Sequence, residues 1–241
     1  MVASITVEKN AYGVVTFNCA EKEVILTSDI VQRHLASCGI NKDDRKNPFS
    51  LLVLGEIKRI DDCSFADYCL EHVDLSHSSV KEIGNHSFQG CRFLKSITIP
   101  ACVESIGESA FALCPRLESF SIDDQNTHFV FSEGAVYNKD KSILFFVLGG
   151  YRGRQFTLPS TVLEIKDCAF VGCRRVERVV CNKLINRIGD FAFDNCHIKS
   201  IVLPDKEIEL GENVFCPETE ILRVPPKLFD SIDIRFLRFK K

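Results

Sequence analysis

Residues 80–122 read VKEIGNHSFQGCRFLKSITIPACVESIGESAFALCPRLESFSI, and this stretch contains one unit twice. In each copy an isoleucine followed by Gly precedes a Phe by five residues, and a Cys follows that Phe by three. An apolar segment with alternating polar residues closes the unit. The copies are about 23 residues apart. A short unit that recurs at a fixed distance predicts coils stacked into a solenoid.

The five-residue spacing from an aliphatic residue to Phe recurs in six copies. The pairs are Ile60/Phe65, Ile83/Phe88, Ile106/Phe111, Ile165/Phe170, Ile188/Phe193 and Leu210/Phe215. The Leu-x-x-Ile-x-Ile segment predicts a strand with alternate side chains inward. The segment from the aliphatic residue to Cys is too short for an independent helix and predicts a short helical turn on the convex side. Because one coil cannot bury its own apolar side, we expect the six Phe side chains to form a single column.

Residues 104–114 and 94–100 resemble the BspA-like leucine-rich repeats, a family of some bacterial surface proteins and of certain anaerobic protists. The resemblance covers roughly residues 50–225. It implies a curved solenoid with a binding or adhesive role and no catalytic residues. The expected fold class is an α/β repeat: a leucine-rich-repeat solenoid with a parallel concave β-sheet, short helical turns on the convex side and a β-hairpin insertion.

Three parts of the chain fall outside this unit. Residues 1–50 predict strands and one helix starting near Ser28, and are interpreted as an N-terminal cap, with a separate module as the alternative. The solenoid then spans residues 51–225, with an insertion at about 124–155 that reads as a hairpin and an exposed loop. Residues 226–241 are expected to cap the other end.

The composition is that of a soluble protein, with 45% hydrophobic residues, 26% charged residues and a formal net charge of −3 over 241 residues. No apolar run approaches the roughly 18 residues of a membrane span. The N-terminus lacks a basic start followed by an apolar core, the mark of a secretory signal. We therefore predict a cytoplasmic protein, with the cell surface as the alternative.

The chain has twelve cysteines, five of which occupy one slot of the repeat: Cys69, Cys91, Cys114, Cys173 and Cys196. We expect a column of buried free thiols, each acting as a small apolar side chain. Disulfides between neighbouring rungs would need an oxidising location. There is no Cys-x-x-Cys, phosphate loop or His-Glu-x-x-His in the sequence, so we expect no catalytic residue, no cofactor and no metal.

The concave sheet is the surface that such solenoids commonly use for binding. Its outward side chains are small and hydroxyl-rich in the middle and aliphatic further on, which resembles an interface core, although Ser, Thr and Val are also good strand residues. The candidate partner-binding residues on this face are His72, Asp74, Ser96, Thr98, Ser119, Ser121, Gln155, Thr157, Arg178, Val180, Ser200, Val202, Ile221 and Arg223.

A second candidate group combines the insertion loop with a basic cluster: Tyr151, Arg152, Arg154, Arg174 and Arg175. Arginine binds carboxylates with two parallel hydrogen bonds, so an acidic protein partner is expected. Nucleic acid is not expected, because the outward positions lack aromatic side chains on which bases could stack. The leading hypothesis is a protein-binding scaffold or recruitment module, and the alternatives are a surface adhesin or a structural subunit of a larger assembly.

Overall fold

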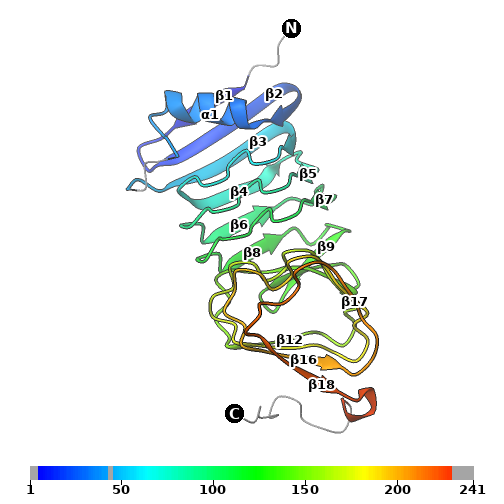
Figure 1. Ribbon diagram of the computed structural model, residues 1–241. Helices are drawn as coiled ribbons and strands as arrows, with labels where there is room; N and C mark the ends of the chain where they lie inside the picture. Colours follow the sequence, from blue (N-terminus) through cyan, green and yellow to red (C-terminus); the bar gives the residue numbers. More distant parts are fainter. Residues whose placement is uncertain (1–4, 43–45, 230–241) are drawn as a thin grey trace.

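A computed structural model describes residues 5–42 and 46–229 and shows an elongated solenoid (Figure 1). The elements are β1 (Thr6–Lys9), β2 (Val14–Leu26), α1 (Ser28–Ser37), β3 (Phe49–Ile60), β4 (Leu70–Ser78), β5 (Glu82–Ile83), β6 (Ser96–Ile99), β7 (Ser105–Ile106), β8 (Ser119–Ile122), β9 (Phe129–Ser132), β10 (Ala135–Asn138), β11 (Ile143–Val147), β12 (Gln155–Thr157), β13 (Glu164–Ile165), β14 (Arg178–Val180), β15 (Arg187–Ile188), β16 (Ser200–Pro204), β17 (Glu209–Leu210), β18 (Glu220–Val224) and the 3-10 turn η1 (Pro226–Leu228).

The predicted parallel sheet is present and is divided into two. One sheet has the order β1-β2-β3-β4-β6-β8, and the other has the order β12-β14-β16-β18. Strands β2 to β8 of the first and all strands of the second run parallel to their neighbours. Two-residue strands form a further parallel ladder on the opposite side of the coils, at β5-β7 and again at β13-β15-β17.

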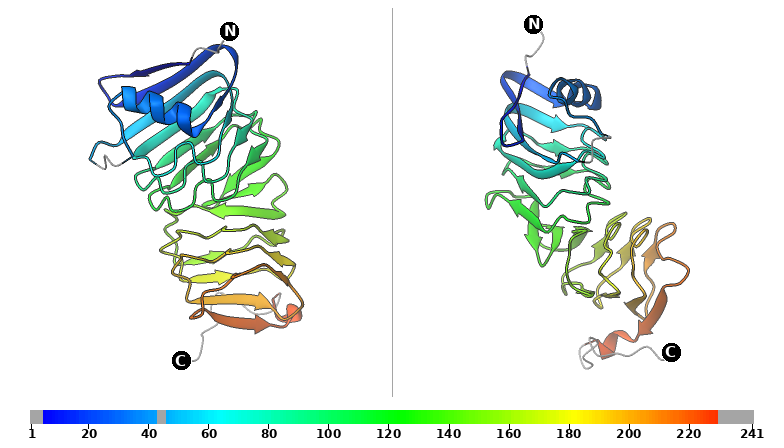
Figure 2. Two further views of the ribbon diagram at one scale, coloured as in Figure 1. Left: turned by 45° about the horizontal axis from the view of Figure 1, so that its top comes forward. Right: turned by 90° about the vertical axis from the view of Figure 1, so that its left-hand side faces the viewer.

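The coils therefore make two stacks, a first stack from β1 to β8 and a second stack from β11 to β18. Figure 1 shows the first stack from the side and the second nearly along its axis, and Figure 2 shows the axis turning between them. The main hydrophobic core is divided in the same way, with one cluster in each stack. The turn lies at the insertion, where β11 takes the place of a repeat strand and pairs in parallel with β13.

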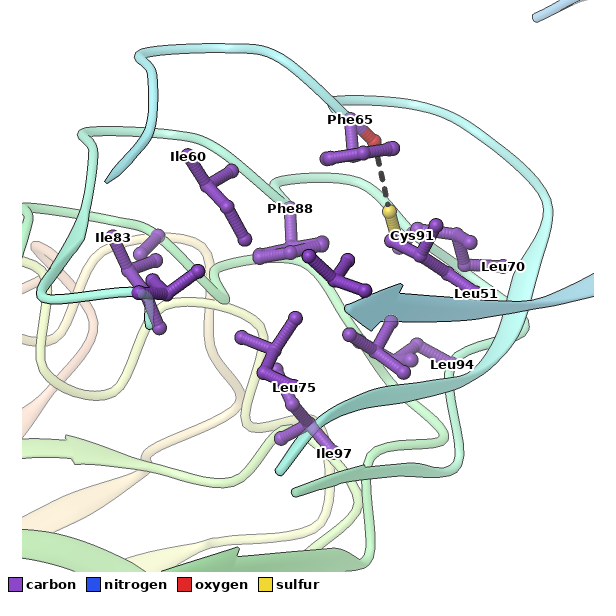
Figure 3. Packing of buried hydrophobic residues seen from close by; sticks show 14 of the residues in the cluster. Leu51, Ile60, Phe65, Leu70, Leu75, Ile83, Phe88, Cys91, Leu94 and Ile97 are labelled. Carbon is purple, nitrogen blue, oxygen red and sulfur yellow. Dashed lines mark hydrogen bonds between the residues drawn. The ribbon is translucent and has the colours of Figure 1, made fainter. Parts of the chain in front are cut away.

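The repeated Phe side chains form two columns, so the prediction of a single column is wrong. Phe65, Phe88 and Phe111 stack at 5.4 Å between ring centroids with interplanar angles of 4°. In the second stack the ring of Phe193 lies 4.9 Å from Phe170 and 5.7 Å from Phe215. Figure 3 shows Phe65 and Phe88 of the first column among aliphatic side chains of the core. The insertion interrupts the sequence between Phe111 and Phe170, which separates the columns.

The convex segments are successions of turns rather than the predicted helical turns. In the coil after β3, the N–H groups of Ser64, Ala66 and Tyr68 donate to the carbonyls three residues before them. Between these bonds the chain adopts the left-handed conformation, as at Cys63 with φ 55° and Asp67 with φ 63°. The intervening N–H groups donate to the next coil, so the backbone is shared between coils and cannot close into a helix.

Ser64 and Ser87 occupy the same position of this turn in two neighbouring coils. The hydroxyl of the first is hydrogen-bonded, and that of the second is not. Ser64 Oγ donates to Leu26 O at 2.6 Å, with Asp61 O at 2.7 Å. Ser87 Oγ is wholly buried and has no hydrogen-bond partner among the described residues. We expect Ser87→Ala to raise the free energy of unfolding by about 1 kcal/mol and the matched Ser64→Ala to lower it by about 1–2 kcal/mol. Urea unfolding measures both, and a loss of stability in Ser87→Ala would contradict the assignment.

The N-terminal segment shares the sheet and the core of the first coil. The predicted helix is present as α1, and its N-cap is Thr27, whose hydroxyl accepts the N–H of Ile30. Val31 and Leu35 are buried in the first core, and β2 pairs with β3 over most of its length. The predicted hairpin is also present, as antiparallel β10 and β11, with β9 added as a third strand. Of the predicted C-terminal cap, residues 230–241 lie outside the described residues.

Candidate partner-binding surface

The first stack presents the predicted hydroxyl-rich surface on β4, β6 and β8. The register aligns His72 with Ser96 and Ser96 with Ser119, and in the same way Asp74 with Thr98 and Thr98 with Ser121. All six side chains are exposed or half-buried. The residues between the two rows, Val73, Ile97 and Phe120, are buried in the core. We call the two rows together the hydroxyl face.

Two short-range contacts order one end of this face. His72 Nδ1 and Ser96 Oγ lie 2.7 Å apart, and Asp74 Oδ1 accepts the N–H of Ser76 at 2.9 Å. The hydroxyls of the other three side chains of the face, Thr98, Ser119 and Ser121, form no hydrogen bond with another described residue. These hydroxyls are therefore available to a partner as both donors and acceptors.

The candidate residues of the second stack do not continue this face, because β12 is not bonded to β8. Gln155 is half-buried and Thr157 is exposed on β12, and Arg178 is half-buried beside it on β14. The Nε of Arg178 donates to Ser200 Oγ at 3.3 Å, and Ser200 is buried.

The prediction that Val180 and Val202 present an aliphatic surface is wrong. Both are wholly buried, and they form a small separate cluster with Val224. Leu222 of β18 and Phe229, directly after η1, pack against this cluster. The chain thus covers its own second sheet, because three aligned aliphatic side chains gain more from burial than from exposure to water.

Ile221 and Arg223 were placed in the outward row, and the register shows that they are not in it. Ile221 pairs with the core residue Ile201, and Leu222 pairs with Val202. The step from β16 to β18 is 20 residues and the step from β14 to β16 is 22, whereas the prediction used a step of 21. Because side chains alternate between the two faces of a strand, this shift of one residue selected the wrong face. Ile221 is nevertheless 41% exposed, because no further coil covers it within the described residues.

The insertion-loop residues are largely engaged within the protein. The Arg152 guanidinium donates to a Glu118 carboxylate oxygen, which holds the pKa of Glu118 below its ordinary value. Arg154 pairs with Glu177 at 3.4 Å. The ring of Tyr151 packs 5.4 Å from Phe156, its hydroxyl donates to Gln155 O, and burial raises its pKa.

Arg174 and Arg175 are both exposed at the corner that leads into β14. Within residues 5–42 and 46–229, neither guanidinium forms an ion pair. These two side chains remain as the free part of the predicted basic cluster, so the cluster is smaller than the sequence indicates.

The repeated cysteines form two short series, and the thiols of three of them bond the backbone of the preceding coil. Cys91 Sγ lies 3.1 Å from Phe65 O, Cys114 Sγ 3.2 Å from Phe88 O, and Cys173 Sγ 3.5 Å from Val147 O. Burial raises the pKa of all three, that of Cys114 to about 12, and none of the twelve cysteines, all of which lie in the described residues, forms a disulfide. The protonated thiol is the form that this slot stabilises.

The described part of the chain holds no cluster of three His, Cys, Asp or Glu side chains that could bind a metal ion. It also contains no helix with the length and hydrophobicity needed to cross a membrane.

Sequence reasoning missed a cavity at the junction of the two stacks. It has a volume of about 170 Å³ and is lined by residues 106–112, 145–147, 166–169 and 171. None of the candidate residues lies in it. The one sequence signal was the long interval between Ile106 and Ile165, which marks a missing rung without showing what the break encloses.

The parallel coils, the two columns of Phe side chains and the short convex turns define a leucine-rich-repeat solenoid protein. A family model described as "BspA type Leucine rich repeat region" matches six copies over residues 50–144 and 150–233. The chain therefore belongs to the BspA-type leucine-rich-repeat family.

Two solved structures share this fold. A leucine-rich repeat protein from Eubacterium ventriosum is 18% identical, with a TM-score of 0.61 over 93% of this chain and 71% of that one. The pneumococcal vaccine antigen PcpA is 14% identical, with a TM-score of 0.57 over 92% of this chain and 83% of that one. None of the curated proteins compared matches the chain.

Proposed function

We propose that the protein is a non-enzymatic binding module that holds a partner protein on the hydroxyl face. The observation that carries the proposal is the alignment of six small polar or imidazole side chains in two exposed rows over three strands. Small side chains allow a partner backbone to approach a rigid sheet closely, and an uncharged centre is typical of interface cores.

The second sheet is partly covered by the chain itself, which supports the first sheet as the binding surface. The chain buries Val180 and Val202 under its own C-terminal segment and leaves the hydroxyl face uncovered. Arg174 and Arg175 add two unpaired positive charges, which favour acidic side chains at the edge of the partner. The assignment of residues 1–50 as a cap and of the protein to the cytoplasm stays a prediction.

The test compares what immobilised variants capture from a lysate of the source cells. We expect Thr98→Arg with Ser121→Arg to lose at least about tenfold of the partner that the unchanged protein captures, because two long cations would stand in the interface core. The matched controls are Thr157→Arg on the second sheet and Ser105→Arg on β7. Both should still capture the partner. Equal capture by all variants would refute the hydroxyl face as the binding surface, provided that circular dichroism shows each to be folded.

A further inference from the structure

The junction cavity lies where the regular stacking of Phe rings stops, between the two stacks of coils. In the first stack each Phe ring is covered by the parallel ring of the next coil. Phe111 is the last of that column, and no ring contact joins it to Phe170 in the described residues. Phe146 covers it instead, at 5.4 Å but tilted by 36°. A tilted ring fills less of the space that a parallel ring would occupy, and the cavity lies beside it.

Apolar side chains form part of the wall of this cavity, and its size suits one aromatic ring. Its walls include Ile106, Phe111, Phe145, Phe146 and Val171. A volume of about 170 Å³ is close to that of engineered apolar cavities that bind benzene. The faces of phenylalanine rings also attract cations, so the walls suit an aromatic group that carries a positive charge.

The mouth of the cavity carries negative charge. Glu108 is exposed there and forms no ion pair with any described residue. Lys166, the one cation in the lining, is engaged with Glu164 at 2.8 Å. Asp167 adds a second carboxylate, and one of its oxygens accepts the N–H of Asp190 at 2.8 Å. Arg187 lies close enough to Asp167 to feel its charge but bonds Glu164 and Glu209.

The half-buried thiol of Cys168 lines the same cavity and is affected by the same negative charges. Its Sγ lies 3.6 Å from Glu108 Oε1. Burial is the largest cause that raises its pKa, and the charges of Glu108 and Asp167 raise it further. Both carboxylates therefore act on the same point of the cavity wall.

We propose that the junction cavity binds a small aromatic ammonium ion, with its ring against Phe111 and Phe146 and its nitrogen at the Glu108 carboxylate. The ring takes the place of the aromatic ring that the next coil would supply, and the ammonium group bonds the Glu108 carboxylate, which forms no ion pair with a described residue. This site is separate from the hydroxyl face and does not depend on the function proposed for it.

The test uses 2-phenylethylammonium as the probe and the full chain, followed by calorimetry and by NMR shifts of the lining residues. We expect a dissociation constant of about 0.1–1 mM, as suits a ligand of this size. The neutral analogue 2-phenylethanol should bind about tenfold more weakly, because it lacks the charge-assisted hydrogen bond.

Two variants in matched slots make the test specific. Glu108→Gln should weaken binding of the ammonium probe about tenfold, whereas Glu212→Gln, the same slot and charge change in the last coil, should leave it unchanged. Val171→Phe should fill the cavity and remove binding. Equal affinity for probe and neutral analogue, or equal effects of Glu108→Gln and Glu212→Gln, would overturn the proposal, and neither measurement depends on Val171→Phe being folded.

Discussion

Replacing Phe88 with alanine is expected to lower the free energy of unfolding by about 4 kcal/mol. Phe88 is wholly buried between the parallel rings of Phe65 and Phe111, each 5.4 Å away. The change removes a large apolar side chain and leaves a cavity that two stacked coils cannot easily close. Urea unfolding followed by far-UV circular dichroism measures the loss.

The matched control is Phe191→Ala. Phe191 belongs to the corresponding turn of the second stack but is 40% exposed, so we expect a change within about 0.5 kcal/mol. The φ of 52° at position 191 is unfavourable for phenylalanine and for alanine alike, so the Phe191→Ala change neither adds nor relieves backbone strain. A loss below 1 kcal/mol in Phe88→Ala, or equal losses in both variants, would show that the Phe column does not hold the coils together.

Asn182→Leu is expected to cost about as much, roughly 4 kcal/mol, through hydrogen bonds instead of packing. The buried Asn182 Nδ2 donates to Pro159 O at 2.6 Å and to Val162 O at 2.8 Å in the preceding coil. Its Oδ1 accepts the N–H groups of Leu184 and Ile185. Leucine has a similar volume, so the change removes four hydrogen bonds while the space stays filled. Three backbone groups then lack a partner, because Pro159 O still accepts the N–H of Val162.

Thermal and urea unfolding of Asn182→Leu check this expectation against Asn186→Leu. Asn186 lies in the same turn but is exposed, and its side chain bonds no other described residue. We expect this control to change stability by less than about 0.5 kcal/mol. If both variants were equally stable, the side-chain amide of Asn182 would not stabilise the contact between these coils.

The repeat made the strands and the inward residues predictable. Once Ile83 and Phe88 set the period, the same positions in other coils followed, and these residues are buried in the five coils from Ile60 to Phe193. In the last coil Leu210 is 41% exposed. The left-handed residues did not follow, because φ is positive at His86, Ser109 and Phe191, which share no side-chain property. Glycine would have marked such positions, and the solenoid imposes them through hydrogen bonds between coils instead.

The role of the buried Asn182 could not be predicted for a similar reason. Asn182 reads as an ordinary turn residue, and only the position of the preceding coil shows which carbonyls it serves. The prediction of the binding surface was wrong where distant parts of the chain cover the sheet. Nothing local to Val180 shows that Phe229, far along the chain, packs over the cluster to which it belongs.

The division of the core at the insertion has a consequence for how chains of this kind can change in length. In a solenoid each coil interacts mainly with its neighbours, so a duplicated or deleted coil is felt only locally. Here β9 to β11 separate two such arrays, and each keeps its own hydrophobic interior. One stack can therefore be extended or shortened by whole units of about 23 residues while the other keeps its geometry and the junction between them keeps its shape.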